Sequence, residues 1–198
     1  PTNIKSYNKF LNFIIGGRGI GKTYGFKKDC ISRYKKKGKQ FLYLRRFKTD
    51  LKKIKTFLND QFENFKDDEF KITGGSNFTT FYINGCEMGY ATSLTSFASL
   101  KSTSYVDVDT IIVDEFIPEK AGFNAYIPNE VEILLNIIDS IFRQREGHVY
   151  LLANNVSIVN PYFSYFGITP NPEKEFNTFK GNDSVEQIIV QICHSDYK

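Results

Sequence analysis

Residues 13–28 read FIIGGRGIGKTYGFKK and place four glycines within six positions, between an apolar run and a Lys–Thr pair. Glycine is unfavourable inside regular structure because it loses much conformational freedom on folding. The stretch therefore predicts a sharp turn, or a close approach of the backbone to a ligand. The flanking residues predict a buried strand over 11–15 and a helix from Lys22 to about Lys37, with Gly38 as its stop.

The glycine stretch also matches the P-loop pattern G-x-x-x-x-G-K-[ST] without a gap. In such a loop, backbone N–H groups surround phosphate oxygens, and the following helix directs its positive N-terminus at them. A lysine reaches the β- and γ-phosphates, and the hydroxyl beside it binds Mg²⁺. The pattern thus predicts ATP and Mg²⁺ as ligands, with a mere glycine turn as the alternative. The predicted nucleotide-binding residues of the loop are Gly16, Gly17, Arg18, Gly19, Ile20, Gly21, Lys22 and Thr23.

A second apolar run, IIVDEF over residues 111–116, ends in two carboxylates. We expect Asp114 to join Thr23 in holding Mg²⁺, directly or through water. Glu115 would polarise the attacking water, since hydrolysis needs a group in line with the γ-phosphate. The alternative is that two acids simply end a strand.

The remaining pattern predicts an α/β fold with a mainly parallel central sheet flanked by helices, in a single domain over residues 1–198. Further strands are expected over 40–46, 110–116, 148–155 and 185–193. The spacing of Leu51, Ile54, Leu58 and Phe62 predicts an amphipathic helix over 49–65. Three more local features are expected: a hairpin turn at Asn84–Gly85, a capping box of Asn129 and Glu132 opening a helix that runs to about Arg145, and an irregular segment over 160–176.

Polar residues near the expected carboxyl ends of strands supply further candidates. Asn154 and Asn155 could bind the γ-phosphate or the attacking water, or simply form a turn. Arg143 and Arg145 could complete a neighbouring subunit's site, or only favour a helix C-terminus by their charge. For Arg18, and for Arg45, Arg46 and Lys48 after the second strand, nucleotide or subunit contact stands beside a plain role as surface charge.

Charge is distributed unevenly along the chain. Residues 1–55 hold 17 Lys and Arg against two acids, whereas the rest of the chain is acidic. A basic third suggests a polyanionic partner, although the run over 35–37 also fits a solvated helix face. A loop is expected over 98–108, and its part over 98–105, with Lys101, is a weak candidate for contacting that polyanion. Three scattered cysteines predict reduced thiols, and the sequence contains no apolar run long enough for a membrane span.

Several stretches together resemble the DNA-packaging ATPases of small tailed phages of the phi-29 type. They are LNFIIGGRGIGKT, QFLYLRRFKTDL, IIVDEF, YIPNEVEILLNIIDSIFRQRE and LANNVSIVNPYF, spread over roughly residues 10–168. The resemblance implies a ring-forming P-loop ATPase of the additional-strand (ASCE) type, related to terminase large subunits and FtsK/HerA-type translocases. It also implies that the family's nuclease-like C-terminal domain is absent from this chain.

By the same resemblance, Lys22, Thr23, Asp114 and Glu115 form the catalytic set, and an arginine of FRQRE acts on the neighbouring site. Lys48 lies in a motif that contacts a neighbour's nucleotide. The implied function is an ATPase that drives double-stranded DNA into a procapsid, as a homopentamer helped by a packaging RNA, at the portal vertex in the host cytoplasm.

A small-molecule kinase is the alternative function. It would need an arginine-rich lid and an acceptor pocket, and it would not need Glu115. A guanine-nucleotide switch is disfavoured because no Asn-Lys-x-Asp stretch occurs.

Overall fold

The computed structural model describes residues 2–97, 105–119, 125–154, 157, 159–181 and 186–193. Most of the expected loop over 98–108, including Lys101, and also Asn155 lie outside this range. The strands are β1 (Leu11–Gly16), β2 (Gln40–Arg45), β3 (Phe70–Gly74), β4 (Phe78–Ile83), β5 (Cys86–Ser93), β6 (Val108–Asp114), β7 (His148–Ala153), β8 (Phe176–Lys180) and β9 (Glu186–Cys193). The helices are α1 (Thr2–Lys5), α2 (Lys22–Lys37), α3 (Glu130–Phe142) and α4 (Pro161–Phe166), with 3₁₀ segments η1 (Lys48–Leu51), η2 (Ile54–Thr56) and η3 (Asn59–Asn64).

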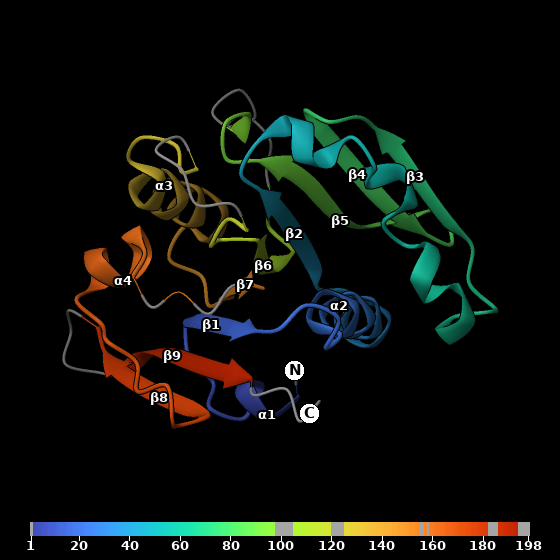
Figure 1. Ribbon diagram of the computed structural model, residues 1–198. Coiled ribbons are helices and arrows are strands. Elements are labelled where there is room, and N and C mark those ends of the chain that lie inside the picture. Colours follow the sequence, from blue (N-terminus) through green and yellow to red (C-terminus); the bar gives the residue numbers. More distant parts are fainter. Residues whose placement is uncertain are drawn as a thin grey trace.

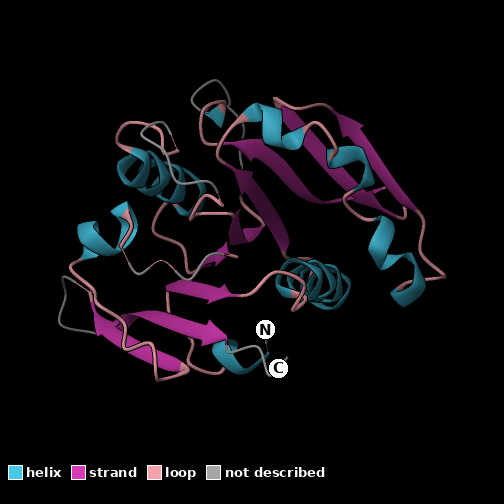
Figure 2. Ribbon diagram, in the orientation of Figure 1, coloured by secondary structure: helices cyan, strands magenta, loops and turns pink. Residues whose placement is uncertain are grey.

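These strands form one nine-stranded sheet in the described part of the chain, in the order β3-β4-β5-β2-β6-β7-β1-β9-β8 (Figures 1 and 2). The six strands from β5 to β9 in this order are parallel, and antiparallel strands extend the sheet at both edges. The predicted mainly parallel sheet is therefore confirmed. Strand β7 lies between β1 and β6, so the strands before the glycine loop and before the two acids are not neighbours.

Helices cover both faces of the sheet (Figure 1). Side chains of α3 and α4 pack on one face and those of α2 and the 3₁₀ segments on the other. Strand β1 serves both layers, because Phe13 and Ile15 point into the first and Ile14 into the second. A strand buried on both faces reads as a mostly apolar run. Residues 11–15 fit this except for Asn12, which is buried and donates to the carbonyl oxygens of Lys9 and Val149, at 2.8 and 3.2 Å.

Two predicted local features, the stop of α2 at Gly38 and the hairpin turn at Asn84–Gly85, are confirmed. Helix α2 starts at Lys22 and ends at Lys37, and Gly38 caps it in the left-handed conformation with φ 65°. The Asn84–Gly85 turn joins β4 and β5, and both residues have positive φ, as a type I′ hairpin turn requires.

The predicted helix over 49–65 is wrong. Three short 3₁₀ segments replace it, broken by turns. Gln61 is fully buried there, whereas Phe62 is 47% exposed. Leu51, Ile54 and Leu58 do face the core, but their spacing does not distinguish an α-helix from successive 3₁₀ turns that rest on α2.

The predicted capping box of Asn129 and Glu132 is also wrong. Asn129 precedes α3 in the left-handed conformation, with φ 54°, and its side chain makes no capping hydrogen bond in the described structure. The carboxylate of Glu130 instead accepts the N–H of Ile127, at 3.0 Å. The helix ends at Phe142, three residues before the predicted Arg145.

The expected irregular segment over 160–176 also needs correction. It contains helix α4, which begins with Pro161, and it leads into strand β8. Asn160 caps this helix, since its side chain accepts the N–H of Phe163 at 3.0 Å. An Asn–Pro pair is a helix start signal, so this helix could have been predicted.

Candidate nucleotide-binding and catalytic site

The carboxyl ends of four parallel strands bring the predicted site residues to one edge of the sheet. The glycine loop follows β1, Arg45 ends β2, Asp114 ends β6 and Asn154 follows β7. Ligands of parallel sheets bind at this edge. The predicted grouping is therefore present.

The glycine loop has the backbone that its sequence requires. Gly19 and Gly21 have φ of 85° and 79°, a region that side chains disfavour. A Cβ added at either residue would meet nothing within 4 Å, so the demand for glycine comes from the turn itself. The loop ends at the N-terminus of the 16-residue helix α2, whose free N–H groups favour an anion.

Lys22 lies folded back onto this loop. Its Nζ donates hydrogen bonds to the carbonyl oxygens of Gly16 and Gly17, at 2.9 and 2.7 Å. Burial lowers the pKa of the Lys22 ammonium, against the raising effects of Cys193 and Asp114. A phosphate would supply the negative charge that this buried ammonium lacks, so the loop and lysine fit a nucleotide.

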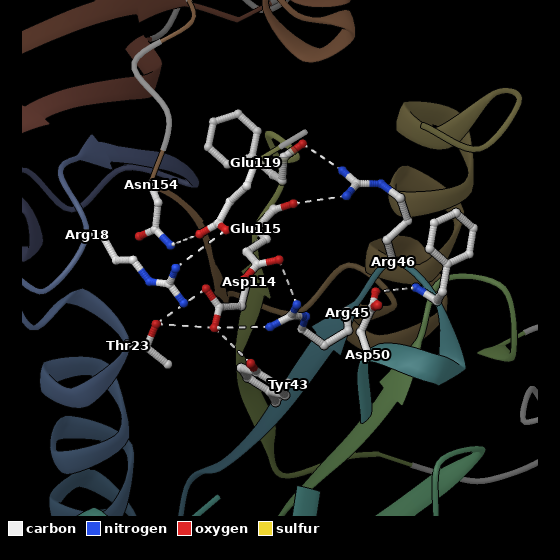
Figure 3. Close-up of polar contacts among 12 residues, drawn as sticks. Arg18, Thr23, Tyr43, Arg45, Arg46, Asp50, Asp114, Glu115, Glu119 and Asn154 are labelled. Carbon is white, nitrogen blue, oxygen red and sulfur yellow. Dashed lines mark hydrogen bonds and ion pairs between the residues drawn. The ribbon is translucent and has the colours of Figure 1, made fainter. Parts of the chain in front are cut away.

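Asp114 is the meeting point of three side chains, as Figure 3 shows. Thr23 Oγ1 donates to its carboxylate at 3.2 Å, and Tyr43 Oη donates to the same oxygen at 2.8 Å. The Arg45 guanidinium lies 3.9 Å away. A hydroxyl beside a carboxylate is the hard-oxygen pair that Mg²⁺ prefers, so Thr23 and Asp114 fit the predicted metal role. Sequence analysis missed Tyr43, which looks like one more aromatic residue in a buried strand.

Glu115 has an unusual backbone and a charged partner. Its φ is 62°, a left-handed conformation that is costly for residues other than glycine. Its carboxylate accepts a 2.7 Å hydrogen bond from Arg45 Nη2. Partial burial raises the pKa of Glu115, Arg45 lowers it and Asp114 raises it. Arg45 Nε is buried without a hydrogen-bond partner among the described residues.

Arg18 and Asn154 both lie beside Glu119. Asn154 Nδ2 donates to Glu119 Oε1 at 3.1 Å, and Arg18 Nη1 lies 3.8 Å from Glu119 Oε2. The Arg18 side chain is 83% exposed, so it can move toward a ligand on the loop. Sequence analysis missed Glu119, which has no local signal.

Three other predicted residues lie elsewhere. Arg145 donates to the carbonyl oxygens of Val106, Tyr105 and Ile141, the last two at 3.0 and 2.5 Å. Residues 105 and 106 precede β6, so this arginine lies at the amino-terminal edge of the sheet, opposite Asp114. Arg143 is exposed nearby, and its Nε donates to the Ser140 carbonyl oxygen at 3.3 Å.

The third of these residues, Lys48, is exposed at the start of η1. No contact joins Lys48, Arg143 or Arg145 to the glycine loop among the described residues.

A buried ion pair supports the turn that carries Glu115. Arg46 Nε and Nη2 donate to the two carboxylate oxygens of Glu130, at 2.7 and 2.9 Å. The same guanidinium donates to the carbonyl oxygens of Glu115 and Phe116, at 3.1 and 2.8 Å (Figure 3). Glu130 is separated from Arg46 by 84 residues, so no local pattern predicts the pair.

Comparisons with known proteins identify the family of this chain. The family model described as podovirus DNA encapsidation protein (Gp16) matches residues 1–196. A protein of Bacillus phage B103 named DNA packaging protein is 49% identical over 191 residues, which cover 96% of this chain and 56% of that protein. This chain thus spans about half the length of the curated relatives that it matches.

Solved structures match as well. The N-terminal domain of the DNA packaging ATPase from bacteriophage phi29 has a TM-score of 0.90 and 42% identity, covering 100% of this chain and 97% of that one. A chain of the phi29 viral genome packaging motor assembly has a TM-score of 0.85 and 43% identity, covering 97% of this chain and 56% of that one.

More distant matches share only the fold. The large terminase of a thermophilic bacteriophage has a TM-score of 0.55 at 14% identity, covering 95% of this chain and 40% of that one. The described residues contain no helix long and apolar enough to cross a membrane. With its motifs at one sheet edge and a family match over nearly its whole length, the chain belongs to the podovirus DNA encapsidation protein (Gp16) family.

Proposed function

We propose that this chain is an ATP-hydrolysing motor domain that drives double-stranded DNA into a viral procapsid. One observation carries the proposal: the Thr23 hydroxyl lies 3.2 Å from Asp114, directly beside Glu115 and the lysine of the glycine loop. That juxtaposition pairs a metal site with a candidate water-orienting group. The position of β7 between β1 and β6 supports the additional-strand type of P-loop ATPase.

The chain's own residues divide the chemistry among them. The glycine loop and Lys22 bind the phosphates of ATP, and Thr23 and Asp114 hold Mg²⁺. When bound, Mg²⁺ neutralises negative charge on the phosphates. Glu115 orients the attacking water through its carboxylate, which must be ionised to accept a proton. Arg45 stabilises that ionised form, and Asn154 and Arg18 lie where they can respond to the γ-phosphate.

We propose a ring with shared sites, and the position of Arg143 supports it. Arg143 is exposed at the edge of the sheet opposite Asp114, so it cannot serve its own site but can reach a neighbour's. Arg145 is already held by three carbonyl oxygens and is the weaker candidate. We propose a homopentamer at the portal vertex of the procapsid, in the host cytoplasm, with packaging RNA and portal as partners. The motor assembly of a relative supports this setting.

The small-molecule kinase is not favoured. The matched relatives are named as DNA packaging proteins, and the chain places a second acid, Glu115, where a kinase would not need one. Phosphate contacts carry no sequence information, so the basic N-terminal third suits sequence-tolerant, salt-sensitive DNA binding.

Mixing of two inactive variants tests the shared site. Glu115→Gln keeps its arginines, and Arg143→Ala keeps its glutamate, so a mixed ring contains some complete sites. We expect ATP turnover to rise more than linearly with protein concentration, and the mixture to regain turnover that neither variant has. Arg145→Ala, mixed in the same way, is the comparison.

Two results would contradict the ring motor. Turnover per molecule that is independent of concentration, together with mixtures that stay inactive, would mean that the site is complete in one chain. The kinase alternative would then be tested with candidate phosphate acceptors.

The pH dependence of hydrolysis tests the ion pair of Arg45 and Glu115. Because Glu115 has a raised pKa and must be ionised, activity should fall on the acid side at a higher pH than for an ordinary glutamate. Arg45 lowers that pKa, so Arg45→Gln should move the acid limb of the kcat/KM profile to still higher pH. Lys71→Gln, the same kind of charge change at an exposed position on β3, should leave the limb in place. An acid limb unmoved by Arg45→Gln would remove Glu115 as the titrating group.

A further inference from the structure

The backbone of Glu115 is held by one buried side chain, the guanidinium of Arg46. Arg46 directly follows β2 and is 7% exposed, and its guanidinium points at the turn after β6. Nη1 donates to the carbonyl oxygen of Glu115 and Nη2 to that of Phe116. The Phe116 N–H in turn donates to the Leu152 carbonyl oxygen in β7, at 3.1 Å. The left-handed turn at Glu115 is therefore tied to β2 and β7.

Glu130 fixes the orientation of that guanidinium. It is 3% exposed and accepts both Nε and Nη2 of Arg46, which is the bidentate geometry of a strong charge-assisted pair. The remaining acceptor capacity is also used, since Tyr162 Oη donates to Oε1 at 2.7 Å and the Ile127 N–H to Oε2 at 3.0 Å. A buried pair saturated in this way has one geometry, because any shift leaves a charge uncompensated.

The members of this network come from separate elements. Arg46 follows β2, Glu130 is the first residue of α3, and Tyr162 lies in α4 and is fully buried. Among the described residues, the hydrogen-bond partners of Arg46 and Glu130 lie in the turn after β6, in α4 and just before α3, and none lies in the glycine loop. The network's direct hydrogen bonds to the site are those to the carbonyl oxygens of the turn that carries Glu115.

We propose that Arg46 and Glu130 are positioning residues for Glu115. They hold the strained left-handed backbone that directs this carboxylate to the edge of the sheet, and so link the packing of α3 and α4 to the placement of the attacking water. The inference rests on the proposed ATP hydrolysis. It assigns a function to a buried ion pair that belongs neither to the phosphate-binding glycine loop nor to the proposed metal site of Thr23 and Asp114.

Arg46→Lys is the first test. Lysine keeps the charge, but its ammonium lacks the planar set of donors with which the guanidinium bonds a carboxylate and two carbonyl oxygens together. We expect kcat for ATP to fall roughly 10- to 100-fold, because small misplacements of a reacting group have effects of that size. KM and ADP affinity should stay within about 3-fold of wild type, since the loss is of an interaction that matters only to the chemical step.

Two further variants separate positioning from stability. Arg33→Lys is the matched control, because Arg33 pairs with Asp109 and Thr110 at the far edge of the sheet, at 2.7 and 2.5 Å. It should lower thermal stability without lowering kcat of the folded protein. Tyr162→Phe removes only one hydroxyl from the network and keeps the ring, so it tests the proposal even if Arg46→Lys does not fold. Its kcat should fall about 3- to 10-fold.

The double variant of Arg46→Lys and Glu115→Gln gives the decisive comparison. If Arg46 acts through Glu115, adding Arg46→Lys to Glu115→Gln should change the residual turnover by less than about 2-fold. An equal loss in both backgrounds would overturn the proposal, as would an unchanged kcat in folded Arg46→Lys and Tyr162→Phe. Absence of turnover in wild type would instead refute the proposed function itself.

Discussion

Glu115→Gln is expected to lower kcat for ATP hydrolysis by roughly 10²- to 10⁴-fold, the range that loss of a general base produces. The amide keeps the shape of the side chain and an oxygen for the hydrogen bond from Arg45, but it cannot accept a proton from water. Nucleotide affinity should change by less than about 3-fold, because the glycine loop and Lys22, which bind the phosphates, are separate from this side chain. Steady-state turnover and equilibrium binding of ADP measure the two quantities.

Glu132→Gln is the control for this prediction. Glu132 is an exposed carboxylate on α3, so the same chemical change there should leave turnover within about 2-fold of wild type. If Glu115→Gln retained most of its turnover, the water would be oriented by another group, and Asp114 would be the next residue to test.

Phe13→Ala is expected to lower the free energy of unfolding by about 3–5 kcal/mol, the range for removing a buried phenylalanine. Phe13 is fully buried in β1 and contacts the rings of Phe116 and Phe163, each at a centroid distance of 5.3 Å. Truncation opens a cavity directly beneath the turn that carries Glu115. Chemical denaturation, with an unchanged m-value as the sign of two-state unfolding, measures the loss.

Phe62→Ala is the matched truncation. Phe62 is 47% exposed, so the same change should cost less than about 1 kcal/mol. Equal losses at both positions would mean that the burial of Phe13 does not determine its contribution.

The parts of the fold that sequence predicted well are those set by neighbouring residues. Strand β1 and helix α2 follow from a mostly apolar run, a glycine turn and the stop at Gly38. The hairpin between β4 and β5 follows from Asn84–Gly85, which tolerates the positive φ of the turn. The central residues of the candidate site were also predicted from neighbouring residues. Lys22 and Thr23 belong to one short motif, and Asp114 and Glu115 end one apolar run.

What sequence missed depends on contacts between distant residues. Gln61 is buried in the segment predicted as an amphipathic helix, because packing on α2 selects 3₁₀ turns that no periodicity specifies. The pairing of Arg46 with Glu130 joins residues 84 positions apart. Arg45 and Arg46 stand together at the end of a buried strand, at the sheet edge where Asp114 and Glu115 also lie. This is a weak signal that could have suggested acidic partners for the two arginines.

The sheet order sets the time at which the glycine loop can form during synthesis. Leu11 in β1 pairs with Val149 in β7 and Ile188 in β9, so both of its neighbours leave the ribosome long after it does. At elongation rates of roughly 5–20 residues per second, about 140 residues pass before β7 is made, which takes on the order of 7–28 seconds. Until β7 emerges, β1 has neither of its strand partners, and its second edge stays open until β9 follows. The glycine loop is therefore held on a completed sheet only late in synthesis.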